Sequence, residues 1–118
     1  MSGSTSYHAG FAAEEIVADH YWRNGRSVLA RRWRGKGGEL DLITRDGDDI
    51  VFVEVKKSSS FAKAASSLGK RQMARLCRGA SEFVATLPKG QLTPIRFDVA
   101  VVNGIGAVEI IENAFMEA

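Results

Sequence analysis

Residues 37–57, GGELDLITRDGDDIVFVEVKK, limit the possible folds more than any other part of the chain. Two apolar runs flank a turn rich in Asp and Gly, and this pattern predicts a β-hairpin. Asp41 interrupts the first run, and Glu54 and Lys56 interrupt the second. Charged side chains rarely lie in the middle of apolar strands unless they are paired or bind metal. The hairpin therefore predicts a sheet that carries a polar site.

Two turns are compatible with this hairpin, and both place the same charged side chains on one face. A type II′ turn at Gly47 and Asp48 puts Asp41 opposite Glu54, whereas a type I′ turn at Asp46 and Gly47 puts Asp41 opposite Phe52. Alternate side chains of a strand share a face, and directly opposed residues project to the same side. Either turn collects four charged residues on one face: Glu39, Asp41, Glu54 and Lys56. The other face takes the predicted core residues: Leu40, Leu42, Val51, Val53 and Val55.

The rest of the chain predicts one α/β domain over residues 1–118, with residues 1–6 flexible. Helices are expected at about 7–24 and 67–87, and strands at about 27–34, 38–44, 50–57, 95–102 and 107–111. Residues 58–66 read as a polar loop, and the glycines of GKGG (35–38) predict a flexible basic loop.

Both predicted helices carry an apolar stripe at helical spacing. The stripe of the first helix contains Phe11, Ala18, Tyr21 and Trp22. The stripe of the second helix contains Leu68, Leu76, Ala80, Phe83, Val84 and Leu87. The element order is therefore α-β-β-β-α-β-β, which places a mixed sheet between flanking helices.

Asp41 and Glu54 favour a metal site. Two carboxylates held close together repel each other unless a cation lies between them. Oxygen ligands of this kind suit Mg²⁺ or Mn²⁺. Lys56 reaches the same space, where it could orient a water or stabilise charge on a phosphate. The pattern indicates metal-assisted phosphodiester hydrolysis, and the alternative is a half-exposed hairpin with a surface Glu54–Lys56 pair.

The charge distribution favours a polyanionic partner. The net charge is only +2, but the segment 23–78 holds fourteen Lys and Arg residues against six Asp and Glu residues. Nucleic acid is the commonest partner of such a basic segment, and the alternative is a solvated basic surface without a partner. The candidate nucleic-acid contacts are Lys36, Lys57, Lys70, Arg71, Arg75 and Arg78.

Several classes of protein are disfavoured by what the sequence lacks. Cys77 is the single cysteine, which excludes an intramolecular disulfide and a cysteine-based zinc site. No run approaches the roughly 18 apolar residues of a membrane helix, and no signal-peptide pattern opens the chain. We therefore expect a cytoplasmic protein that does not associate with membranes.

The hairpin and its flanking motifs resemble the PD-(D/E)XK nuclease superfamily, whose core has the order α-β-β-β-α-β. Asp41 takes the place of its conserved Asp, without a preceding Pro, and Glu54-Val55-Lys56 takes the place of its (D/E)XK element. A closer resemblance is to the YraN-like family of predicted endonucleases, which are related to Holliday-junction resolvases. That resemblance covers nearly the whole chain and rests on five motifs: Gly10 to Glu14, GELDLI (38–43), VFVEVK (51–56), RFDV (96–99) and NAF (113–115).

The resemblance implies roles for individual residues. Asp41, Glu54 and the backbone of Val55 would hold Mg²⁺ or Mn²⁺, with Lys56 beside them. Glu14 resembles the helix carboxylate that supports a metal-bound water, and its alternative is an exposed helix glutamate. Gln72 aligns with a catalytic helix position, although Lys70 is an alternative. Two further carboxylates, Glu39 and Asp98, have structural alternatives, and for Asp98 the alternative is a strand residue that pairs with Arg96 or with a helix end.

The resemblance also implies a restriction-endonuclease-like fold and a function. The expected function is a metal-dependent endonuclease that acts on DNA, with branched or damaged DNA as one option. The alternative is a catalytically silent nucleic-acid-binding protein that keeps the fold. A homodimer is expected only by analogy, because a four-way junction has two-fold symmetry.

Overall fold

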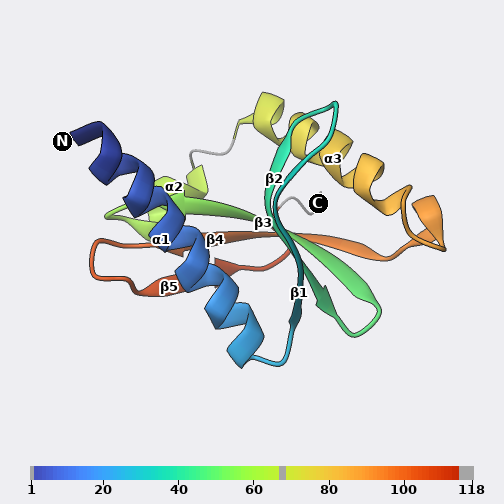
Figure 1. Cartoon of the computed structure of the whole chain (residues 1–118), viewed down its shortest axis with the longest axis horizontal. Coiled ribbons are helices and arrows are strands. Elements are labelled where there is room, and N and C mark those ends of the chain that lie inside the picture. The colour runs from blue at the N-terminus through green and yellow to red at the C-terminus, as the bar shows by residue number, and fades with distance from the viewer. Residues whose placement is uncertain (1, 67–68, 115–118) are drawn as a thin grey trace.

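The computed structural model describes residues 2–66 and 69–114 (Figure 1). The helices are α1 (Ser2–Arg23), α2 (Phe61–Ser66), α3 (Lys70–Val84) and the short 3₁₀ helix η1 (Gly90–Leu92). The strands are β1 (Ser27–Arg34), β2 (Glu39–Asp46), β3 (Asp49–Lys57), β4 (Ile95–Val102) and β5 (Val108–Ile111). Leu68 of the second predicted stripe and Phe115 of the NAF motif lie outside the described residues.

The five strands form one mixed sheet in the order β1-β2-β3-β4-β5. The strands β1, β2 and β3 pair antiparallel, β4 runs parallel to β3, and β5 is antiparallel to β4. Parallel neighbours need a long crossover connection, and the segment with α2 and α3 supplies it. The predicted α/β sheet flanked by helices is confirmed.

The helices α1 and α3 cover opposite faces of the sheet (Figure 1). The core on the α1 face combines helix residues Ala13, Val17, Ala18 and Tyr21 with Leu42, Val51, Val53, Ala100 and Val102. The core on the α3 face combines Leu76, Ala80 and Val84 with Leu40, Ile43, Ile50 and Phe52. The sheet is therefore buried on both sides at its centre. No helix of the described residues is long and apolar enough to cross a membrane.

Most strand bounds agree with the sequence, whereas α1 begins at Ser2, before the predicted start at about residue 7. The strands β1 and β4 have the predicted limits, whereas the predicted loop 58–66 contains the helix α2, so that prediction was wrong. This helix buries Ala64 against Val99 and Val101 of β4. Trp22 was wrongly assigned to the core stripe, because 69% of it is exposed.

The carboxyl end of α1 is closed by a Schellman motif, which sets the direction of β1. Gly25 has a φ of +80°, and its N–H donates to the Trp22 carbonyl at 3.0 Å. The Arg26 N–H donates to the Tyr21 carbonyl, also at 3.0 Å. This turn brings Arg26 next to the sheet, where its guanidinium pairs with Asp46 at 3.0 Å.

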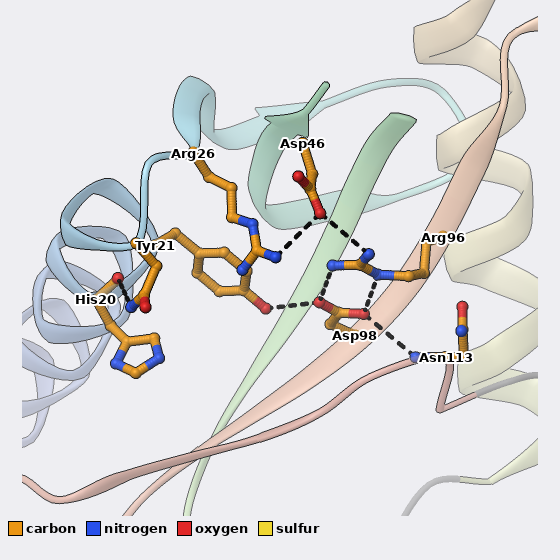
Figure 2. Close-up of polar contacts among 8 residues, drawn as sticks. His20, Tyr21, Arg26, Asp46, Arg96, Asp98 and Asn113 are labelled. Carbon is orange, nitrogen blue, oxygen red and sulfur yellow. Dashed lines mark hydrogen bonds and ion pairs between the residues drawn. The ribbon is translucent and has the colours of Figure 1, made fainter. Parts of the chain in front are cut away.

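A buried polar cluster joins α1, β4 and the end of the described chain (Figure 2). The buried Asp98 carboxylate accepts hydrogen bonds from the Tyr21 hydroxyl at 2.9 Å and from two Arg96 nitrogens at 2.9 and 3.1 Å. It also accepts the backbone N–H of Asn113 at 3.3 Å. Asp98 therefore pairs with Arg96 as expected and holds the elements together.

We predict that Tyr21→Phe lowers the free energy of unfolding by about 1.5–3 kcal/mol, because a hydrogen bond to a buried charged group is lost. Chemical denaturation measures this change. Trp22→Phe is the matched control on the same helix, since its exposed ring should change stability by less than about 0.5 kcal/mol. Equal effects of the two changes would contradict the structural role of the cluster.

Candidate active site

The candidate site lies where β2 separates from β3. The hairpin turns at Gly47, with φ +62°, and pairs Asp46 with Asp49, as in the type II′ alternative. The described ladder continues to the pair Leu42–Val53. One residue further along, the Asp41 carboxylate accepts the Val55 N–H at 3.0 Å. The Asp41 side chain thus accepts the Val55 N–H of β3. In a continued ladder, this N–H would donate to a backbone carbonyl of β2.

The separation of the strands corrects the predicted position of Leu40. Strand parity placed it on the face of Leu42, but Leu40 is buried in the core on the α3 side. It packs so closely on Gly79 that a Cβ there would lie 3.2 Å from the Leu40 Cδ2. The β2–β3 ladder ends at Leu42–Val53, before Leu40, although Leu40 still pairs with Trp33 of β1. Strict alternation relative to β3 therefore no longer applies at Leu40.

Glu54, Gln72 and Lys56 form a hydrogen-bonded chain next to Asp41. Glu54 is 9% exposed. The Gln72 Nε2 donates to Glu54 Oε2, and the Lys56 Nζ donates to Gln72 Oε1 at 3.3 Å. The two partners fix the orientation of the amide, because its nitrogen must face the carboxylate and its oxygen the ammonium. The structure therefore brings Gln72 into the site, whereas Lys70 is exposed.

The electrostatics of Glu54 differ from those of a surface carboxylate. Burial, together with hydrogen bonding and charge repulsion from Asp41, raises the pKa of Glu54 to about 8, and Lys56 and Gln72 oppose this rise. A buried carboxyl next to a second carboxylate favours its neutral form unless a cation is bound. The Asp41–Glu54 pair therefore favours a bound proton or a bound cation.

Glu14 approaches this pair from α1 but is engaged by an arginine. Burial and the charge of Asp41 raise the pKa of Glu14, while Arg32 lowers it. The Arg32 Nη2 lies 3.2 Å from Glu14 Oε1, and its Nε lies 4.0 Å from Glu39 Oε1. Glu39 also pairs with Arg34 at 3.0 Å. Glu39 is therefore held by ion pairs at the edge of the site.

Arg32 is a residue that sequence reasoning missed. It has a positive φ of 50°, which is uncommon for a side chain of this size. A bulge between Val28 and Ala30 precedes it in β1. The run RRWR gives no sign of which arginine takes the positive φ and turns toward the carboxylates.

An open cleft exposes the pair to solvent. It is lined by Asp41, Glu54, Gln72 and Arg75 and by residues 34–39. Of the predicted nucleic-acid contacts, Lys36 and Arg75 line it, and Arg34 joins them without having been predicted. Four other predicted contacts are exposed and are not part of this lining: Lys57, Lys70, Arg71 and Arg78.

The glycine loop 35–38 is docked on α3, in contrast to the flexible loop expected from the sequence. The Glu82 carboxylate accepts the backbone N–H groups of Lys36, at 2.7 Å, and of Gly37. Within the loop, the Gly35 N–H donates to the Gly38 carbonyl at 3.0 Å. The loop therefore forms a defined wall of the cleft.

The donor set of the cleft suits a hard cation with few protein ligands. Within 2–66 and 69–114, no group of three or more His, Cys, Asp or Glu side chains is placed to hold a metal. Asp41 and Glu54 supply two carboxylates. The Val55 carbonyl belongs on the same strand edge as its N–H, because both groups of a residue in a ladder face one neighbour. Mg²⁺ accepts such a set, since it keeps several waters.

The chain matches the Uncharacterised protein family UPF0102 over residues 13–102. It belongs to this family. A UPF0102 protein of Cereibacter sphaeroides strain KD131 is 62% identical over 115 residues, which cover 98% of each chain. A UPF0102 protein of Ruegeria pomeroyi is 58% identical over 113 residues, which cover 96% of this chain and 92% of the relative. The matched region contains GELDLI, VFVEVK and RFDV, whereas the names of the relatives state no activity.

We predict that Glu54→Gln stabilises the metal-free protein increasingly as the pH rises. The folded chain holds a proton on Glu54 up to a pKa of about 8, above the ordinary value of 4.5. The protonated Glu54 therefore leaves the fold fully stable below pH 4.5, and part of that stability is lost as the pH rises from 4.5 toward 8. At pH 8 the variant should be more stable than the parent by about 2 kcal/mol or more.

Urea unfolding in a chelating buffer between pH 4.5 and 8 measures this difference. The control is Glu109→Gln on β5, an exposed glutamate, which should leave the pH dependence unchanged. A stability gain of Glu54→Gln that is constant with pH would contradict the prediction.

Proposed function

We propose that this protein is a Mg²⁺- or Mn²⁺-dependent endonuclease that hydrolyses phosphodiester bonds of DNA, with branched or damaged DNA as the candidate substrate. The observation that carries the proposal is the gap between β2 and β3. There Asp41, the buried Glu54 and Gln72 line a cleft with basic walls. Lys56 is not part of this lining and joins the site through its hydrogen bond to Gln72. The resemblance to the PD-(D/E)XK superfamily supports the same assignment.

The proposed roles follow from the contacts of each side chain. Asp41, Glu54 and the Val55 carbonyl would hold the cation, which when bound polarises a phosphate and lowers the pKa of a bound water. Lys56 would stabilise negative charge that develops on the phosphate. Gln72 orients Glu54 through its amide nitrogen and Lys56 through its amide oxygen.

The basic residues around the cleft would bind the phosphate backbone. Arg34, Lys36 and Arg75 line the cleft itself. Arg71, Arg75 and Arg78 are exposed and follow one another at helical spacing along α3. Such contacts position a nucleic acid without reading its sequence.

A catalytically silent nucleic-acid-binding protein is the second candidate, and one observation favours it. The Arg32 guanidinium lies 3.2 Å from Glu14, so the carboxylate that the resemblance assigns to a metal-bound water already has a cationic partner. The two candidates differ in whether the Asp41–Glu54 pair takes a divalent ion.

We predict that Asp41→Asn removes most divalent-ion binding, because one of two carboxylate ligands loses its charge. The fold should survive, since Asn is nearly isosteric and its amide oxygen can still accept the Val55 N–H. Lys56→Ala should keep metal binding but reduce the cleavage rate by about 10²–10³-fold, as for loss of one transition-state donor. Both variants should still bind DNA.

Calorimetry with Mn²⁺ and cleavage of single-stranded, duplex and branched DNA measure these effects. Glu109→Gln on β5 is the control that removes one charge elsewhere. If the parent binds no divalent ion at millimolar concentration, with or without DNA, the nuclease proposal fails and the silent binding protein is the better account.

We also predict that the triple change Arg71→Gln, Arg75→Gln, Arg78→Gln weakens DNA binding and reduces its salt dependence. Each lost phosphate contact should reduce the slope of log K against log salt by about 0.9 for duplex DNA. Gln keeps part of the aliphatic stem, so packing of α3 is largely preserved. Binding isotherms at several salt concentrations measure the slope, and an unchanged slope would identify these arginines as a solvated face.

A further inference from the structure

Glu82 connects α3 to the wall of the cleft. Its Oε2 accepts the Lys36 N–H at 2.7 Å, and its Oε1 accepts the Gly37 N–H. Glu82 itself is not among the residues that line the cleft. The contact joins residues 45 and 46 positions apart in sequence, so it is a specific tertiary link between the loop and the helix.

Three glycines make this close approach possible. A Cβ at Gly35 would lie 2.5 Å from Glu82 Oε2, and a Cβ at Gly37 would lie 2.8 Å from Glu82 Oε1. A Cβ at Gly38 would lie 2.7 Å from the Arg75 Cγ. Each distance is below normal contact, so a side chain at any of these positions would displace the loop or the Glu82 and Arg75 side chains from the observed arrangement. Lys36 is the one loop residue with a side chain, and it is exposed.

Both the helix and the proposed ligand disfavour a carboxylate at position 82. Glu82 lies in the last turn of α3, where the helix dipole is unfavourable to negative charge. It also adds negative charge near a surface that would bind a polyanion. The two hydrogen bonds from the loop offset these costs, which indicates that holding the loop is the role of this side chain.

We infer that Glu82 is a positioning residue that fixes the 35–38 loop as a nucleic-acid-binding wall and so holds Lys36 toward a phosphate. This inference rests on the proposed function of the cleft. It assigns Glu82 no contact with DNA or with the reacting atoms. The effect on DNA is exerted through the backbone of Lys36 and Gly37.

Glu82→Gln separates this role from a simple charge effect, because the two predict opposite changes in DNA affinity. Removing a negative charge near a DNA-binding surface should tighten binding. Losing the second acceptor should release the loop and weaken binding, with a salt slope lower by about 0.9 as for one lost phosphate contact. Glu109→Gln removes the same charge from β5, at the sheet edge opposite β1, and is the matched control.

Gly37→Ala tests the same link without any change of charge. Its methyl group would lie 2.8 Å from Glu82 Oε1 and 3.0 Å from the Arg78 Cβ, so either the loop or the Glu82 carboxylate must shift, and either shift disturbs the hydrogen bond between them. The inference predicts weaker DNA binding and the same lower salt slope. Thermal unfolding of each variant shows whether the domain is folded, and the comparison uses folded variants at a common temperature.

The combination of Glu82→Gln with Lys36→Ala completes the test. Lys36→Ala should weaken DNA binding in the parent but have a smaller effect in the Glu82→Gln background, because Lys36 is then no longer held in place. Additive effects, or tighter binding by Glu82→Gln, would overturn the inference. If the parent itself binds no DNA, the proposed function fails instead, so the two failures are distinguishable.

Discussion

The hydrogen bond from the Val55 N–H to the Asp41 carboxylate is the contact on which the candidate site depends. It occupies a donor of β3 at the point where β2 leaves the ladder. Because β2 turns away there, Leu40 can pack on α3 and the cleft can open between the strands. A ladder continued past Leu42 would place a backbone carbonyl where the carboxylate lies. The site therefore forms where the β2–β3 pairing ends, and the Asp41 side chain stabilises this local interruption.

The sequence predicted those parts of the site that follow from local periodicity. Strand parity was sufficient to bring Asp41, Glu54 and Lys56 together, since all three lie in or next to regular pairing. It failed at Leu40, because departure from the ladder depends on the packing of Leu40 against Gly79 on another element. Arg32 was also missed, because nothing in the run RRWR indicates which residue takes the positive φ.

The GKGG loop shows a different limit of sequence reasoning. Glycine permits flexible chain, but it also permits backbone to approach another element closely. In this chain the second property applies, because Glu82 and Arg75 occupy the space that side chains at 35 and 38 would need. The spacing of the loop from Glu82 in the sequence gives no sign of their contact. Only the packing of β2 against α3 brings them together.

Two buried carboxylates of the same sheet differ in what surrounds them. Asp98 faces an arginine, a tyrosine hydroxyl and a backbone N–H (Figure 2), which stabilise its charge without any added ion. Burial and the Asp98 carboxylate raise the pKa of Tyr21, so the hydroxyl remains a donor. Glu54 instead faces a second carboxylate, and burial disfavours its charge. The partners of Asp98 already balance its charge, which supports a structural role for the RFDV motif. The arrangement at Glu54 would gain from a bound cation, which is the physical reason to propose chemistry at Glu54 and not at Asp98.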